Sequence, residues 1–172
     1  LYVLTINPCQ IAGNTVGKKT KSLNFWTKEE FDRFIATFDK GDPFYTAFLI
    51  LYYTGIRIGE LEALTVGDID QEAHTLTINK TYHLIGGKGI ITPPKTEKAN
   101  RTITLPRFLL EAIQRHIRRL YGAGKATRLF IASHSSYARQ METHTKKAGV
   151  RRIRLHDLRH SHASLLIEMG FS

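Results

Sequence analysis

The sequence predicts a mostly helical α+β domain with a small three-stranded antiparallel sheet. Apolar residues recur at helical spacing up to about residue 64, apolar and polar residues alternate between 74 and 105, and helical spacing returns after Pro106. Because the strands form one block between two groups of helices, a doubly wound parallel sheet is excluded. The 172 residues, of which 42% are hydrophobic, suffice for one well-cored domain and are few for two.

Capping residues and periodicity place the individual elements. Thr27 followed by Glu30 forms a capping box at the first helix, and Pro43 begins a second, almost entirely apolar helix that ends at Gly55. Helices are expected at 27–39, 43–54, 58–64, 107–117, 136–148 and 156–170, and strands at 74–80, 89–92 and 101–105. Residues 1–24 have loop chemistry and are interpreted as a linker from an upstream domain, with the folded domain at 25–172.

The net charge of +10 is concentrated in one part of the chain. Between Arg107 and Arg159 there are 13 lysines and arginines against three acidic residues, while the charges elsewhere cancel. Such a stretch suits a surface that faces phosphates, with solvated basic helix faces as the alternative. Within it, the cluster of Arg151, Arg152 and Arg154 is the candidate for contacts to a DNA backbone.

Other features bear on location. The single cysteine, Cys9, cannot form an internal disulfide, and no apolar run approaches the roughly 18–20 residues of a membrane span. No secretory signal is present, and the chain opens at Leu1 instead of a methionine. We therefore expect a cytoplasmic protein, of which this chain is a fragment.

The first cluster that could carry chemistry is TGIRIGEL, residues 54–61. Arg57 follows a glycine turn at the end of the apolar helix, and Glu60 comes one helical turn later. The guanidinium could offer two parallel hydrogen bonds to a phosphate while Glu60 orients it. The alternative is an exposed Arg57–Glu60 pair worth a few tenths of a kcal/mol.

The second cluster is TPPKTEK, residues 92–98, between two expected strands. A turn there can project Lys95 away from the scaffold, where an ammonium could touch a phosphate oxygen or donate a proton. A solubilising role is the alternative for any hairpin lysine, and Lys88 and Lys98 compete with Lys95.

The third cluster is LHDLRHSH, residues 155–162. His156 and Arg159 share a helix face near an N-terminus, where free N–H groups favour an anion. The HDLRH spacing also resembles the zinc-protease helix, but an aspartate is short for the general base and Arg159 disfavours a dication. We therefore expect no metal, and we expect His160 and His162 to be ordinary helix residues.

Taken together, these clusters resemble the tyrosine recombinase, or phage integrase, family. TGIRIGELEALTVGDID is similar to its first arginine box, PPKTEKANRTITLP to its hairpin lysine and following strand, and HDLRHSHASLLIEMG to its H-x-x-R box. The resemblance extends from about Thr27 to the C-terminus and is greatest to integrases of bacterial phages and conjugative elements. It implies the fold of that family's catalytic domain.

The resemblance also implies roles for individual residues. Arg57 and Arg159 would clamp the scissile DNA phosphate, His156 would donate a hydrogen bond, and Lys95 would protonate the departing 5′ oxygen. Glu60 would support Arg57. Neither a metal nor another cofactor is expected, because the cationic side chains stabilise the charge that develops at the phosphate.

The sequence departs from the family pattern at both ends. The family's nucleophilic tyrosine lies a few dozen residues after the H-x-x-R box, whereas this chain ends 13 residues after Arg159. Tyr121 and Tyr137 lie upstream and do not match it, and the core-binding domain that precedes the catalytic domain is also absent. We therefore expect a recombinase fragment that binds double-stranded DNA without cleaving it, from a parent that forms synaptic tetramers on the nucleoid. A non-catalytic DNA-binding or regulatory module is the alternative.

Overall fold

The computed structural model describes residues 24–94 and 100–170. Its helices are α2 (Lys28–Ile35), α3 (Pro43–Thr54), α4 (Ile58–Ala63), α5 (Arg107–Ile117), α6 (His134–Ala148) and α7 (Asp157–Glu168), with a 3-10 turn, η1, at Val66–Asp68. Its strands are β1 (Ile69–Asp70), β2 (Thr75–Ile78), β3 (Thr81–Ile85), β4 (Lys88–Thr92) and β5 (Arg101–Thr104). The α+β class is confirmed. The expected linker at 1–24 lies outside the described residues, apart from Asn24.

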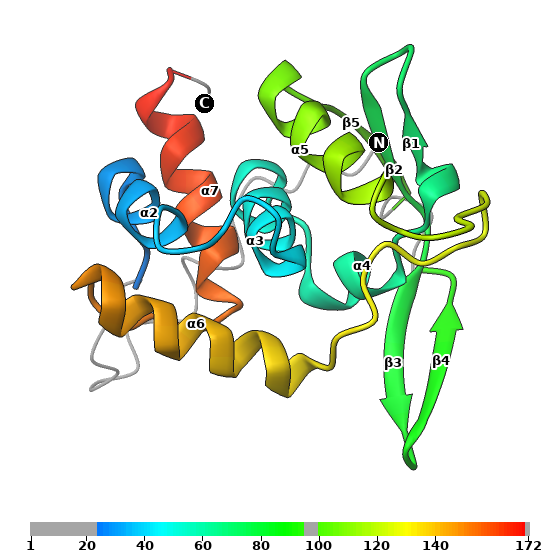
Figure 1. The fold of residues 1–172 in the computed structure, drawn as a ribbon. Helices are drawn as coiled ribbons and strands as arrows, with labels where there is room; N and C mark the ends of the chain where they lie inside the picture. The colour runs from blue at the N-terminus through cyan, green and yellow to red at the C-terminus, as the bar shows by residue number, and fades with distance from the viewer. Residues whose placement is uncertain (1–23, 95–99, 171–172) are drawn as a thin grey trace, which may run out of the picture.

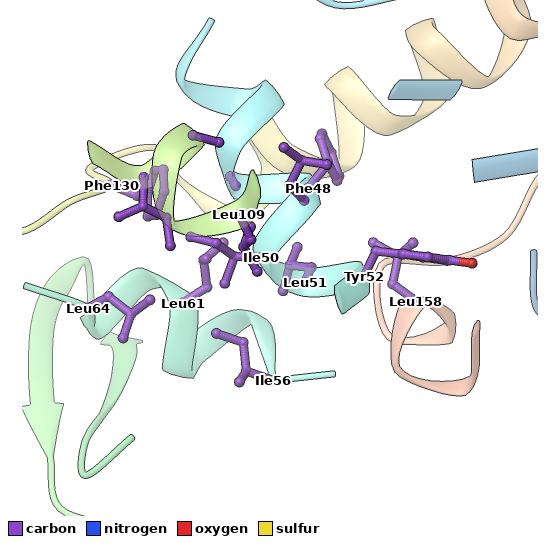
Figure 2. Packing of buried hydrophobic residues seen from close by; sticks show 14 of the residues in the cluster. Phe48, Ile50, Leu51, Tyr52, Ile56, Leu61, Leu64, Leu109, Phe130 and Leu158 are labelled. Atoms are coloured by element: carbon purple, nitrogen blue, oxygen red, sulfur yellow. The ribbon is translucent and has the colours of Figure 1, made fainter. Parts of the chain in front are cut away.

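Helix α3 is the centre of the helical part and contacts α2, α4, α5 and α7 (Figure 1). Its start is capped by the Asp42 side chain, Pro43 occupies the first turn, and Gly55 ends it in the left-handed conformation at φ +61°. Apolar residues around almost the whole helix are buried. Figure 2 shows Ile50 beside Leu61 of α4 and Leu109 of α5, and Tyr52 beside Leu158 of α7. An apolar helix without a polar face is thus explained by neighbours on several sides.

The first helix is shorter than predicted. The capping box of Thr27 and Glu30 is present, but α2 ends at Ile35 and not near residue 39. Residues 36–38 continue as a tighter turn, in which the N–H of Phe38 donates to the carbonyl of Ile35 at 3.2 Å. Phe38 stays buried in this turn, so its apolar spacing imitates another helical turn.

The sheet has three antiparallel strands, as predicted, but one of them is a different segment. The order is β1-β2-β5, and the predicted strand at 89–92 belongs to β4, which pairs with β3 in a separate hairpin. Gly86 and Gly87 both have positive φ, which suits the tight turn that joins neighbouring strands. The turn therefore closes a local hairpin, which extends away from the three-stranded sheet (Figure 1).

The remaining helices agree with the periodicity. Ser133 caps α6, so this helix begins two residues earlier than predicted, and Gly149 ends it at φ +62°. Helix α7 packs along α3, and α6 packs against α2. Across residues 24–94 and 100–170, no helix is both long and apolar enough to cross a membrane.

Candidate functional site

Arg57 lies between the end of α3 and the start of α4. The left-handed turn at Gly55 reverses the chain, so that Arg57 becomes the residue that precedes the first turn of α4. Its backbone N–H donates to Glu60 Oε2 at 2.8 Å, and its Nη1 donates to Oε1 at 3.0 Å. The Arg57 side chain remains 55% exposed. The predicted pair with Glu60 is therefore present, with the guanidinium still accessible.

Glu60 is nearly buried, with 5% of its side chain exposed, and it binds a second arginine. Arg101 on β5 donates from Nη2 to Oε2 at 2.7 Å and from Nη1 to Oε1 at 3.2 Å. Burial alone would raise the pKa of Glu60, but hydrogen bonds from Arg101 and Arg57 lower it below its ordinary value. Glu60 is therefore a carboxylate that joins two arginines.

Arg159 is brought to Arg57 from the other end of the chain. Its Nη1 donates to the carbonyl of Gly55 at 2.6 Å, which ties α7 to the turn before α4. Burial lowers the pKa of Arg159, and the positive charges of Arg57 and Arg101 lower it further. A guanidinium that is crowded by other cations is a group that an anion would stabilise.

Arg57 and Arg159 open onto a cavity of about 500 Å³. Arg57, His156 and Arg159 line it together with part of β3 and residues 131–134. His156 is exposed at the start of α7, and its ring meets that of His160 edge to face at 5.4 Å. Three of the four predicted catalytic residues therefore share one cavity, although they come from segments far apart in the sequence.

Glu62 lines the same cavity and was not singled out from the sequence. Its side chain is buried and its Oε1 has no hydrogen-bond partner among the described residues. Burial raises the pKa of Glu62 to about 7, against a smaller opposing effect of Arg128. Arg128 does not bind this carboxyl group but donates two hydrogen bonds to the backbone carbonyl oxygen of Glu62. Its guanidinium carbon also lies 4.3 Å from the centre of the Tyr82 ring, so Arg128 connects the hairpin to α4.

The site can be compared with known proteins. The family model described as the phage integrase family matches residues 24–172. The chain belongs to this family. It is 28% identical to the ICEBs1 integrase of Bacillus subtilis (strain 168), a match that covers 98% of this chain and 49% of the relative. It is 32% identical to tyrosine recombinase XerA of Pyrococcus furiosus over 71% of this chain and 40% of the relative.

Solved structures agree with this assignment. The Tn1549 transposon integrase in complex with circular intermediate DNA matches with a TM-score of 0.75 and 26% identity, over 90% of this chain and 57% of that chain. The crystal structure of XerA recombinase matches with a TM-score of 0.67 at 22% identity, which supports the fold. The chain spans about half the length of the curated integrases it matches. It therefore has the fold of a tyrosine recombinase catalytic domain.

Within this integrase domain, other predicted residues have different surroundings. Lys95 lies outside the described residues. Arg154 is 81% exposed, yet it binds the buried carboxylate of Asp157 through Nε and Nη2. Arg151 donates to the carbonyl of Phe25 and lies over its ring, while Arg152 lines a second cavity beside His156. Two of the three candidate DNA-backbone arginines thus already take part in internal contacts.

The side chains of His162, Tyr121 and Tyr137 do not line the cavity of Arg57 and Arg159. His162 is half-buried, and its Nδ1 lies 2.9 Å from the backbone carbonyl oxygen of Tyr52. In the part of the chain that the structure describes, no three histidine, cysteine or acidic side chains are grouped as metal ligands. Tyr137 is buried and Tyr121 is fully exposed, and neither lines the cavity.

Proposed function

We propose that this chain is the catalytic domain of a site-specific DNA recombinase and that its cavity holds one DNA phosphate. The observation that carries the proposal is the meeting of Arg57, Arg159 and His156 in one cavity. A rigid pair of guanidinium groups suits the geometry of a phosphate, which accepts two hydrogen bonds from each. The family assignment and the DNA in a related integrase structure support the same function.

In the proposed mechanism, Arg57 and Arg159 bind the non-bridging oxygens and stabilise the pentacoordinate transition state. His156 donates a hydrogen bond to the same phosphate. Glu60 orients Arg57 through the contacts described above. The developing negative charge is thereby met by groups that are already in place, so little rearrangement is needed during the reaction.

In the whole protein, a tyrosine attacks the phosphorus and loses its phenolic proton to solvent. The bond between phosphorus and the 5′ oxygen breaks, and this oxygen leaves with a proton from Lys95. The resulting 3′-phosphotyrosyl bond preserves the energy of the broken bond for rejoining. Residues 1–172 alone are proposed to bind the phosphate without forming this bond. Incubation of the 172-residue chain with duplex DNA, followed by denaturing electrophoresis, should therefore yield no covalent adduct.

The proposed partner is double-stranded DNA, and the whole protein is proposed to form a synaptic tetramer on the nucleoid in the cytoplasm. Arg151, Arg152 and Arg154 are proposed to contact the DNA backbone beside the cavity. Of these, Arg152 lines the neighbouring cavity and has the fewest internal contacts among the described residues. It is therefore the first choice for substitution.

Salt dependence tests DNA binding by this chain. Fluorescence anisotropy with a labelled duplex should show log K falling steeply with log salt between about 50 and 200 mM, because each neutralised phosphate releases counterions. Arg159→Gln should reduce the slope by about 1, since one phosphate contact is lost. Lys28→Gln, at an exposed pair with Asp32 on α2 and outside the basic stretch 107–159, serves as the matched control. Affinity that does not depend on salt would overturn the proposal.

A further inference from the structure

Arg101 occupies an unusual position for a charged residue. It is the first residue of β5 and points to the same side of the sheet as Ile103, while Thr102 and Thr104 face solvent. An arginine on the inner face of a strand loses hydration, so it requires a partner there. That partner is Glu60 on α4, which binds both terminal nitrogens of Arg101.

Arg57 and Arg101 both bind the Glu60 carboxylate, but with different numbers of guanidinium nitrogens. Arg101 makes a two-pronged pair with Glu60, whereas the Arg57 guanidinium donates to Glu60 only through Nη1. Within the described residues, Nε and Nη2 of Arg57 make no hydrogen bond, and more than half of the side chain is exposed. Arg57 therefore retains two donor groups for a further acceptor.

Without Arg101, Glu60 would have a different effect on Arg57. A buried carboxylate needs compensating charge and donors, and Arg57 is the other guanidinium that binds it. A planar guanidinium readily forms a two-pronged pair with a carboxylate, so Arg57 would turn toward Glu60. Its donors would then be occupied by the protein and withdrawn from the cavity.

We propose that Arg101 is a positioning residue that occupies Glu60 and thereby leaves Arg57 available for a DNA phosphate. The inference rests on the proposed function, because it assumes that Arg57 binds a phosphate. Arg101 is not among the residues that line the cavity. It also adds positive charge to the site, as its influence on Arg159 indicates.

The test is DNA binding by the 172-residue chain with Arg101→Gln, Glu60→Gln and the double variant. Arg101→Gln should weaken binding about tenfold and reduce the slope of log K against log salt by about 1, because the Arg57 contact is lost. Adding Glu60→Gln should restore binding to within about threefold of the unmodified chain and restore the slope. A glutamine can still accept the Arg57 backbone N–H but cannot compete as an anion.

Further variants separate positioning from folding. Arg101→Lys keeps a charge without the planar fork and should weaken binding by about threefold. Lys28→Gln, at an exposed pair with Asp32 on α2 and outside the basic stretch 107–159, should leave binding within about twofold. Thermal unfolding establishes that each variant is folded before binding is compared.

Three outcomes would overturn the proposal: a double variant weaker than Arg101→Gln, an unchanged salt slope in Arg101→Gln, or loss of folding in both Arg101→Gln and Arg101→Lys. Failure of the unmodified chain to bind DNA at all would instead contradict the proposed function. The two failures are therefore distinguishable in one series of measurements.

Discussion

Glu62→Gln is the substitution whose effect on stability follows most directly from the structure. The Glu62 carboxyl is buried beside the candidate site, and one of its oxygens has no partner among the described residues. Burial raises its pKa from an ordinary value of 4.5 to about 7. The protonated form is therefore favoured in the folded protein, in which Arg128 and Tyr137 are the ionisable groups that interact with it.

The raised pKa of Glu62 makes the stability of the protein depend on pH. Because the folded state holds this proton to higher pH than the unfolded state, the contribution of Glu62 to the free energy of unfolding falls as pH rises from 4.5 to about 7. Each tenfold change in the ionisation constant is worth 1.36 kcal/mol, so the total loss is about 3 kcal/mol. Glutamine does not ionise, so Glu62→Gln should remove this loss.

The assay is urea unfolding of both proteins at about pH 5 and pH 8. Because part of the loss has already occurred at pH 5, Glu62→Gln should gain about 2–3 kcal/mol more at the higher pH than at the lower, relative to the unmodified chain. An unpaired amide costs the same at both values and cancels in this comparison. Glu111→Gln, at an exposed position of α5, is the control and should show no such difference. An equal effect of Glu62→Gln at both pH values would refute the reasoning.

Other substitutions test the turn before α4 and the core. Gly55→Ala should lower the free energy of unfolding by more than Gly122→Ala. Both glycines have φ near +60°, so the backbone strain is similar. A Cβ at Gly55 would lie 2.5 Å from the His162 ring, whereas a Cβ at Gly122 would have no atom within 4 Å. Equal losses in urea unfolding would contradict the close approach. Leu109→Ala should cost about 2–5 kcal/mol in the same assay, since Leu109 is fully buried in the main core. A loss below about 1 kcal/mol would mean that the core between α3 and α5 is not packed as described.

The sequence predicted those parts of the fold whose local pattern decides the structure. The capping box at Thr27, the apolar run of α3 and the glycine at its end correspond to the observed helix boundaries. The exchange of strands in the sheet was missed because β1 has only two residues and β3, TYHLI, lacks alternation. Such strands are defined by their partners, which a local pattern does not contain.

The sequence predicted only those site residues that belong to a local sequence pattern. The recognisable sequence boxes contain Arg57, Glu60, His156 and Arg159. The fold brings Arg57, His156 and Arg159 together in one cavity. Arg101 and Glu62 were not found, because their environment is created by tertiary packing. The only signal for Arg101 was a charged residue in phase with Ile103 on the inner face of a strand.

Strand cleavage by the proposed full-length recombinase tests the central claim most directly. With a nicked duplex that traps the covalent intermediate, Arg159→Gln should lower the rate of adduct formation at least about 100-fold, because a donor to the transition state is lost. DNA binding should weaken by about tenfold or less, since the other phosphate contacts remain. Cleavage at the unmodified rate, with Arg159→Gln folded and bound to DNA, would contradict the assignment of the cavity as the phosphate site.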